Sequence, residues 1–430
     1  MRVLILAPYY FPYTNPRAYR WTQIAEHWAR SGWEVHVLCS RNPDWPDEHD
    51  LNGVRVHRVG FNSAKELLLR GKLGARQEGP LPWRGVAPTR IPLDPLNRIL
   101  LRSWYWPDDA FWWFRPAWLK ARSLQQRHAF DALVSVSLPF TAHWIGRKLK
   151  GKFPGLFWLA DTGDPFALQP LHPLNNQALY RRRNRRAEEA VLRTADRTVV
   201  TNEGARRLYD EVFPGHPREI AVIPPMSSQW PVELTAGRSA TSSWHLGYFG
   251  SFFPGVRMPA PLLEWFRELL RLEPQLQLHL YGELFESIRP SLGEFADLQA
   301  RVTLHGLLPR SEVPAAMDQM DFLVNLGNRS DFQLPSKSAD YWLAGKPIIN
   351  LTQIESDTFS QFLAGHPLLL QVPVLEKQPS EKELQRCRTF LREHFGRRLP
   401  DDQRRMIAER LSPPSIARQY GQLLLSAQEK

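Results

Sequence analysis

A short polar segment in the C-terminal half of the chain, PSKSAD at 335–340, has the residue types of a phosphate-binding site. Ser336 is predicted to cap the helix that follows, which places Lys337 in its first turn. A helix N-terminus attracts anions through its free N–H groups, and a lysine there adds a full positive charge. Lysines near helix starts are also common as solvated surface residues. The segment therefore predicts either a phosphate site or an exposed helix end.

A second candidate group is the carboxylate of Asp164, in the loop DTGDPF at 161–166. The apolar run at 156–160 predicts a buried strand, so this loop is expected at the carboxyl end of that strand. A carboxylate in that position can orient or deprotonate a substrate hydroxyl group. The alternative is that Asp164 caps the turn that follows.

Both groups are predicted to be positioned by parallel α/β sheets. The sequence around Lys337 reads as a strand at 322–326, a polar loop, a helix ending at Gly345 and a strand at 348–351. This order is half of a doubly wound sheet, in which ligands bind beyond the carboxyl ends of the strands.

The 430 residues are too many for one ordinary core and predict two domains. The alternation of strands and helices occurs twice, on either side of a segment rich in Ser, Thr and Pro. After Leu370 we expect polar helices to the end of the chain. The predicted division is an N-terminal domain at 1–225, a linker at 226–243, a C-terminal domain at 244–410 and a terminal helix at 411–430.

Composition indicates a soluble cytoplasmic protein, with 43% hydrophobic and 23% charged residues. No run approaches the roughly 18 apolar residues of a membrane span. The opening MRVLILAPYYF lacks the cleavage site of a signal peptide and reads as a first buried strand. Cys39 and Cys387 fall in different predicted domains, which indicates free thiols and neither a disulfide nor a metal site.

The net charge of +11 predicts an acidic partner, and no nucleic-acid recognition motif accompanies it. Tryptophans gather at Trp104, Trp106, Trp112, Trp113 and Trp118, and the basic run RRRNRR follows at 181–186. One interpretation is peripheral contact with an anionic membrane, at the inner face of the plasma membrane. The other is that these tryptophans pack a helix against the sheet.

The ordered combination of PSK, Asp340-Tyr341 and LAGKPI resembles one known family. It is similar to the nucleotide-binding segment P-S-K-x-x-(E/D)-Y-x-x-x-G-K-P-(I/V) of family-four retaining glycosyltransferases, of the bacterial surface-polysaccharide type. The opening PxxxPxxxPRAxRW and the loop at 161–166 resemble the N-terminal domain of that family. The resemblance covers nearly the full length. It implies the GT-B fold, with two facing Rossmann-like doubly wound α/β domains and a terminal helix that crosses back to the first.

The activity that this resemblance implies is metal-independent transfer of a hexosyl group, with retention, from a UDP- or GDP-sugar. The acceptor would be a glycan or a lipid-linked acceptor of cell-surface polysaccharide synthesis, and no cofactor is expected. A nucleotide-sugar epimerase and a catalytically silent GT-B scaffold at the membrane are the alternatives. The motif PSKxxDY argues against the epimerase.

The resemblance also assigns roles to residues. Asp164, Arg257 and Lys337 are the implied catalytic residues, and the two cations hold the departing diphosphate. The implied donor-binding residues are Gly250, Ser251, Arg257, Gly282, Glu283, Gly306, Leu308, Pro335, Ser336, Lys337 and Asp340. The implied acceptor-side residues are Asn15, Arg17 and Arg20, although both arginines could instead coat the first helix.

Two positions depart from the family pattern. The E-x7-E carboxylates fall on Phe332 and Asp340, so only the second is retained, as the implied ribose ligand. Asp331 lies next to the lost carboxylate. The arginine of the family loop D-x-R-D-P-W is Gly163 here. The loss of the first carboxylate is the observation that favours the silent scaffold.

Overall fold

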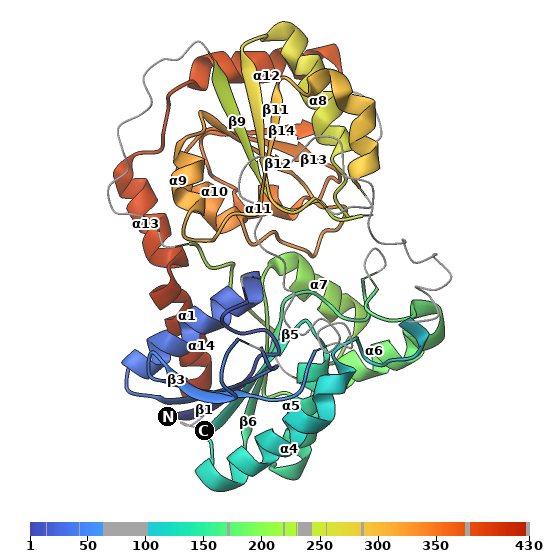
Figure 1. Cartoon of the computed structure of the whole chain (residues 1–430), viewed down its shortest axis with the longest axis vertical. Coiled ribbons are helices and arrows are strands. Elements are labelled where there is room, and N and C mark those ends of the chain that lie inside the picture. The colour runs from blue at the N-terminus through green and yellow to red at the C-terminus, as the bar shows by residue number, and fades with distance from the viewer. Residues whose placement is uncertain are drawn as a thin grey trace. The chain divides into compact units, whose positions relative to one another are not determined.

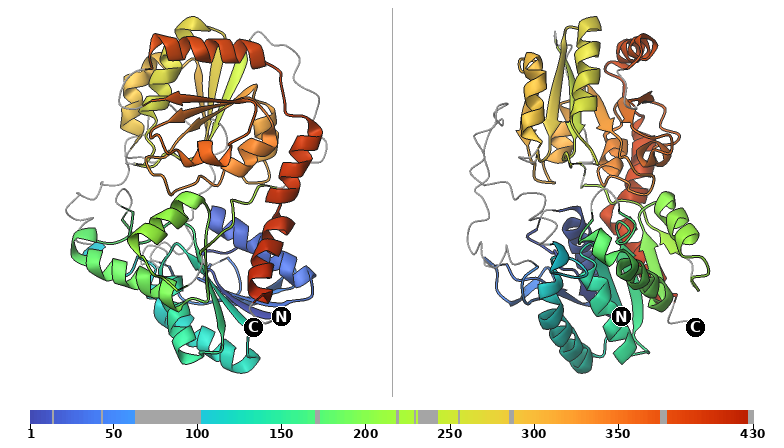
Figure 2. Two further views of the ribbon diagram at one scale, coloured as in Figure 1. Left: turned by 180° about the vertical axis from the view of Figure 1, so that it is seen from behind. Right: turned by 90° about the vertical axis from the view of Figure 1, so that its right-hand side faces the viewer.

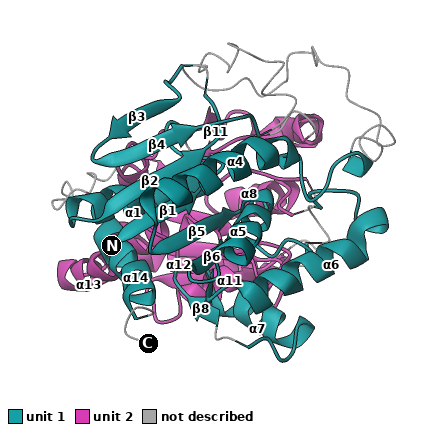
Figure 3. Ribbon diagram, turned by 90° about the horizontal axis from the view of Figure 1, so that it is seen from below, with its two compact units in different colours: residues 1–75, 93–224, 413–430 teal, residues 76–92, 225–412 magenta. Residues whose placement is uncertain are grey.

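The computed structural model shows two α/β units (Figure 1 and Figure 2). It describes the whole chain except residues 14, 43, 63–101, 170–172, 218–219, 229, 231–242, 255, 285–287, 375–378 and 427–430. Unit 1 contains residues 1–75, 93–224 and 413–430, and unit 2 contains residues 76–92 and 225–412 (Figure 3). The fold is therefore the predicted pair of Rossmann-like domains. None of the helices among the described residues is long and apolar enough to cross a membrane.

Unit 1 is built on an eight-stranded sheet of order β3-β4-β2-β1-β5-β6-β7-β8. Its strands are β1 (Arg2–Leu6), β2 (Glu34–Cys39), β3 (Glu48–Leu51), β4 (Val54–Arg58), β5 (Ala132–Ser137), β6 (Phe157–Thr162), β7 (Arg197–Val200) and β8 (Ile220–Val222). Its helices are α1 (Pro16–Arg30), α4 (Phe111–His128), α5 (Thr141–Lys152), α6 (Gln177–Thr194), α7 (Glu203–Val212) and α14 (Pro413–Leu425). All pairs are parallel except β3 with β4. Apolar residues of α4, α5 and α6 pack with β1 and β5 in one core cluster.

The last helix, α14, packs against α1 within unit 1 (Figure 2). The indole Nε1 of Trp28 donates to the carbonyl oxygen of Ala417 at 2.9 Å. The ring of Tyr420 meets the edge of Trp21 at 5.0 Å between centroids. The terminal helix thus completes the core of the unit that contains the first strand.

Unit 2 has a six-stranded, all-parallel sheet of order β11-β10-β9-β12-β13-β14. Its strands are β9 (Trp244–Phe249), β10 (Leu276–Tyr281), β11 (Val302–Gly306), β12 (Phe322–Leu326), β13 (Ile348–Thr352) and β14 (Leu369–Pro373). Its helices are α8 (Ala260–Leu272), the 3₁₀ segment η1 (Arg289–Leu298), α9 (Val313–Asp318), α10 (Ser338–Ala344), α11 (Thr358–Phe362), α12 (Glu381–His394) and α13 (Asp401–Leu411). In order of sequence this is the 3-2-1-4-5-6 arrangement of the Rossmann fold.

Both faces of the second sheet are covered, because successive residues of a strand point to opposite sides. Val324 packs into the cluster formed with α8, η1 and α12. Its neighbour Leu323 packs into the cluster formed with α9, α10 and α11. A strand buried on both faces reads as a nearly continuous apolar run, and residues 322–326 are apolar apart from Asn325.

Three local expectations are wrong. The chain forms strand β14 at 369–373, where we expected only helices after Leu370. The edge strand β3, EHDL, lacks an apolar pattern and was not expected. Ser336 is not a helix cap: α10 begins at Ser338 with Lys337 as its N-cap residue, and Ser338 Oγ donates to Pro335 O at 2.7 Å.

Candidate functional site

The candidate donor site lies at the topological switch point of unit 2. Strands β9 and β12 are neighbours in the sheet, and the chain runs outward from them in opposite directions. The loop that begins at Gly250 follows β9, and the loop that leads to Lys337 follows β12. Ligands of open α/β sheets bind in the crevice between two such loops.

Lys337 places a buried ammonium group at this point. Its Nζ atom is shielded from solvent and has no hydrogen-bond partner in the part of the chain that the structure describes. It lies 4.1 Å from the ring centroid of Tyr248 and 5.2 Å from that of Tyr341. Burial, and then the charge of Arg257, hold the pKa of Lys337 well below its usual value, and Asp357 opposes this shift. An isolated buried charge is unfavourable. A bound anion would therefore stabilise the charged form of Lys337.

Arg257 is the second cation of the site. Its backbone is held by Phe253, because Arg257 N donates to Phe253 O at 2.9 Å and Phe253 N donates to Arg257 O at 3.0 Å. Its side chain is buried, and Nε has no hydrogen-bond partner. A Cβ built on Gly250 would lie 3.0 Å from Lys337 Nζ and 3.5 Å from Arg257 Nη1. The glycine therefore leaves the space between the two cations open.

Three glycine loops meet beside these cations. Gly250 N donates to Tyr281 O at 2.7 Å, and Gly282 N donates to Gly306 O at 2.7 Å. Gly282 has a φ of +138°, and a Cβ there would lie 2.3 Å from Gly250 O, so no other residue fits without a backbone shift. All three glycines line one pocket, together with Tyr281 and Leu304.

The other residues of these loops that were expected to bind the donor differ in their contacts and in their exposure to solvent. Ser251 Oγ accepts a hydrogen bond from Glu283 N at 3.0 Å, which ties the first loop to the second. The side chain of Glu283 is exposed, and Leu308 packs in the core cluster with Phe249. No role was predicted for Tyr341. Its hydroxyl donates to Val324 O at 2.8 Å and accepts from Phe249 N at 2.9 Å. It fastens α10 to the ends of β12 and β9.

Asp340, the residue that the resemblance implies as a ribose ligand, accepts hydrogen bonds from other residues of unit 2. Its side chain is buried, and Oδ1 accepts hydrogen bonds from Ser228 N at 2.6 Å and Trp230 Nε1 at 3.3 Å. Oδ2 accepts from Arg310 Nη2 at 3.1 Å, and the same nitrogen donates to Met226 O. The carboxylate thus holds Ser228 and Trp230 against α10, and the ribose contact stays a prediction.

The positions before Asp340 differ in their exposure to solvent. Pro335 and Ser336 form the turn before α10, and both are half-buried. Phe332, at the position of the lost carboxylate, is buried, whereas Asp331 beside it is exposed.

A second polar group lies at the carboxyl end of β6 in unit 1, with Asp161 at its centre. Asp161 is fully buried, and its Oδ2 accepts from Arg17 Nη1 at 2.9 Å and Trp21 Nε1 at 2.7 Å. Oδ1 accepts from the hydroxyl of Tyr420 at 2.6 Å. One carboxylate therefore joins β6, α1 and α14. No role was predicted for this carboxylate, because all three of its partners are distant in sequence.

The expected acceptor-side residues are brought to this group, with unequal roles. Asn15 is the N-cap of α1 and accepts from Ala18 N at 2.9 Å. Arg20 is buried and donates to Pro224 O at 2.7 Å and to the Tyr420 hydroxyl at 3.0 Å, so it holds the core together. Among the described residues, neither Arg17 Nη2 nor Arg20 Nε has a hydrogen-bond partner. Arg20 is 4% exposed, whereas Arg17 is half-buried, so Arg17 is the better placed of the two arginines to contact a ligand.

The loop has Gly163 at the position of the family arginine, and an arginine from another element lies beside this glycine. A Cβ at this position would lie within 1.9 Å of Arg17 Nη2. The guanidinium of Arg17 thus occupies the space beside Gly163, and the cation comes from α1 and not from the loop itself.

Asp164 follows Gly163 and is half-buried. The loop after it is held by Glu188 of α6, whose carboxylate accepts from Phe166 N at 2.6 Å, Ala167 N at 2.7 Å and the Tyr209 hydroxyl at 2.6 Å. The charge of Asp164 contributes to the raised pKa of Tyr209, after burial and Glu188. The loop is therefore rigidly supported behind Asp164.

The tryptophans divide between the core and the surface. Trp113 is fully buried in the core of unit 1, so the packing interpretation holds for it. Trp106 is half-buried, with the guanidinium of Arg183 3.8 Å from its ring centroid. Trp104 and Trp112 are 83% and 58% exposed.

Comparison with known proteins agrees with this architecture. Residues 18–226 match the family model described as glycosyl transferase 4-like domain. No curated protein matches the sequence. Among solved structures, sucrose-phosphate synthase from Thermosynechococcus elongatus has a TM-score of 0.63 and 16% identity, covering 100% of this chain and 99% of its own.

Two further solved structures cover nearly the whole chain. HepE from Anabaena, in complex with UDP and glucose, has a TM-score of 0.56 and 14% identity, covering 99% of this chain and 100% of its own. WaaG, a glycosyltransferase involved in lipopolysaccharide biosynthesis, has a TM-score of 0.59 and 13% identity, covering 98% and 99%. Residues 18–226 are therefore similar to a glycosyltransferase-family domain, within a chain that has the two-domain GT-B fold.

Proposed function

We propose that this protein transfers a hexosyl group, with retention, from a nucleotide-diphosphate sugar to a glycan or lipid-linked acceptor of cell-surface polysaccharide synthesis. The observation that carries the proposal is the pair of buried cations, Lys337 and Arg257, with an open space at Gly250 between them. The bound UDP and glucose in the HepE complex support the same ligand class.

The two cations would act on the leaving group. Cleavage of the bond between the sugar and the diphosphate leaves negative charge on the phosphate oxygens. Groups that are already buried and fixed in place stabilise that charge without reorganisation. Arg257 can contact two oxygens at once, and Lys337 adds a point charge. We propose that these two residues neutralise the diphosphate without a metal ion.

On the acceptor side, we propose that Asp164 orients or deprotonates the acceptor hydroxyl. Its loop is held by Glu188, so the carboxylate has a fixed direction of approach. The free Nη2 donor of Arg17 is proposed to contact an acceptor oxygen nearby.

A cytoplasmic protein that uses a lipid-linked acceptor would need to lie against the inner face of the plasma membrane, and unit 1 has a surface suited to this contact. Exposed Trp104 is next to Ser103, whose carbonyl oxygen accepts from the Tyr180 hydroxyl of α6 at 2.7 Å. Leu179, beside Tyr180, is 61% exposed, and the arginines of the run 181–186 are exposed. Flotation with anionic liposomes should weaken in Trp104→Ala combined with Leu179→Ala. Unchanged flotation would contradict the membrane contact.

The experiment that tests the donor site is thermal unfolding with UDP-, GDP-, ADP- and TDP-sugars. A ligand at 100 times its Kd stabilises the folded state by about 2.7 kcal/mol, which raises Tm by several degrees. One nucleotide should raise Tm, and Arg257→Ala and Lys337→Ala should each abolish the rise. Arg271→Ala is the matched control, because this arginine is an exposed residue of α8.

The outcomes separate the two classes of protein. A rise with one nucleotide that both site variants lose would support the donor site and identify the base. No rise with any of the four in a folded sample would favour a catalytically silent scaffold with the same fold.

A further inference from the structure

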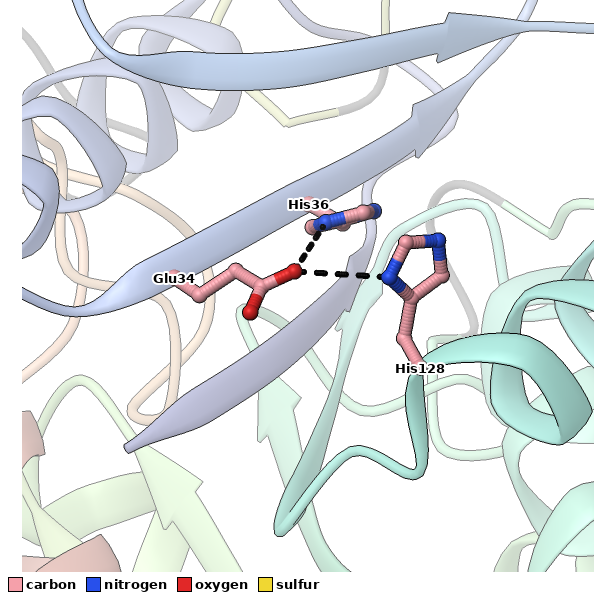
Figure 4. A group of neighbouring side chains, drawn as sticks. All are labelled: Glu34, His36 and His128. Atoms are coloured by element: carbon pink, nitrogen blue, oxygen red, sulfur yellow. Dashed lines mark hydrogen bonds and ion pairs between the residues drawn. The ribbon is translucent and has the colours of Figure 1, made fainter.

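We propose that Glu34, His36 and His128 bind a zinc ion at the amino end of the sheet in unit 1. The three side chains point toward one another from two elements, β2 and the end of α4 (Figure 4). Glu34 and His36 are two residues apart on a strand, so their side chains lie on the same face. His128 is the last residue of α4.

Two of the three distances between ligand atoms are close to those of a tetrahedral metal site, and all three are within 4.8 Å. Glu34 Oε1 lies 3.1 Å from His36 Nε2 and 3.4 Å from His128 Nδ1 (Figure 4). Ligand atoms at about 2.0–2.1 Å from a tetrahedral zinc lie about 3.3–3.4 Å apart. Two imidazoles and a carboxylate are a donor set that zinc accepts, with one position left for water. The Glu34 side chain is 35% exposed, which gives the ion a path from solvent.

A further histidine, His57, contacts the ring nitrogen of His36 that does not face Glu34, and Glu48 contacts His57 in turn. His36 Nδ1 lies 3.1 Å from His57 Nε2, and His57 Nδ1 lies 3.4 Å from Glu48 Oε1. Metal-binding histidines usually donate their other N–H to an acceptor of this kind, which fixes the ring and the tautomer. Lys120 pairs with Glu48 at the end of the line.

The contacts between Glu34, His36, His57 and Glu48 need one more proton than the two neutral histidines carry, and a metal ion can replace it. Three contacts run from Glu34 through His36 and His57 to Glu48, and each needs a proton between its two atoms. Two imidazoles in their neutral form carry only two N–H protons between them. A cation held by Glu34 and His36 Nε2 takes the place of the third proton. Both N–H groups are then available for His57 and Glu48.

The position indicates a role in stability and not in transfer. Glu34 is the first residue of β2, whereas Asp161 and Asp164 lie at or beyond the carboxyl end of β6. Arg55 Nη1 lies 3.5 Å from Glu34 Oε1 and is 58% exposed, so it can move into solvent when a metal ion arrives. The ion would fasten the end of α4 to β2.

The test uses the full chain after removal of metals with a chelator. One equivalent of Zn²⁺ should bind, and at 100 times its Kd it should raise Tm by about 5–10 °C. Co²⁺ in the same site should give the strong visible absorption of a tetrahedral complex. Glu34→Gln and His128→Gln should lose both signals. His27→Gln, on α1, is the matched control and should keep them.

The two site variants separate metal binding from folding. Glu34→Gln keeps an oxygen for His36, and the side chains of Glu34 and His128 are partly exposed, so neither change opens a large cavity. No zinc-dependent rise in the wild-type protein would overturn the proposal. An equal rise in both site variants would also overturn it, because the zinc would then be bound elsewhere. The result does not depend on the donor site, whose residues are all in unit 2.

Discussion

The two units treat their buried charges in opposite ways. In unit 1 the carboxylate of Asp161 is fully paired, with Arg17, Trp21 and Tyr420 as donors. In unit 2 the ammonium group of Lys337 is shielded from solvent and has no hydrogen-bond partner among the described residues, and the charge of Arg257 further lowers its pKa. Paired buried charges hold a structure together, whereas an unpaired one is unfavourable until a ligand arrives. The difference indicates that the Asp161 group serves the core and the Lys337 group serves a ligand.

The largest effect is expected for Asp161→Ala. The substitution leaves a buried guanidinium, an indole N–H and a phenol without their acceptor, and breaking a buried pair typically costs about 3–5 kcal/mol. The free energy of unfolding, measured by urea denaturation, should fall by that amount. Asp47→Ala is the matched control, because the Arg41–Asp47 pair is exposed and should contribute about 1 kcal/mol or less. Equal losses in the two variants would remove the distinction drawn for unit 1.

A smaller effect is expected in the pH dependence of nucleotide binding. The pKa of Lys337 is well below its usual value in the free protein, and a bound diphosphate favours the charged form and raises it. Binding therefore takes up a proton once the pH exceeds the lowered pKa. Affinity should fall as the pH rises between the two values, by at most about tenfold per pH unit.

Isothermal titration calorimetry above about pH 7 checks this, since the terminal phosphate of the nucleotide itself titrates near 6. Lys337→Arg is the control, because arginine stays charged throughout the range and its affinity should not change with pH. An equal slope in this variant would assign the proton to another group.

The sequence was sufficient for features that depend on local pattern. Strand β12 at 322–326 is a mostly apolar run, and the end of α10 follows from Gly345, which has the left-handed conformation with a φ of +62°. Edge strands were missed because they lack that pattern: β3 is polar, and β14 is half exposed. A strand of this kind is specified by the neighbour with which it pairs, which sequence alone does not reveal.

The roles of site residues depended on distant partners in the same way. The motif that contains Lys337 predicted an anion site. It did not predict that the carboxylate of Asp340 accepts hydrogen bonds from Ser228 and Arg310. Likewise, the sequence shows Gly163 in place of the family arginine, but it does not predict that Arg17 lies beside that glycine. Each of these contacts joins residues far apart in the chain, and residue type alone does not fix which partner a buried polar group finds.

The smallest effect, with the opposite sign to that of Asp161→Ala, is expected for Lys337→Met. Methionine keeps an unbranched apolar chain against the rings of Tyr248 and Tyr341 and removes the unpaired buried charge. The loss of cation–π attraction partly offsets the gain, so the free energy of unfolding should rise by about 1 kcal/mol. Urea denaturation without ligand measures this, and the nucleotide-dependent rise in Tm should vanish in the same variant. A residue retained for binding is expected to destabilise the free protein, because its charge has a partner only in the complex. If Lys337→Met were instead less stable than the wild type, the ammonium group would be part of the structure, and the contrast between the two units would fail.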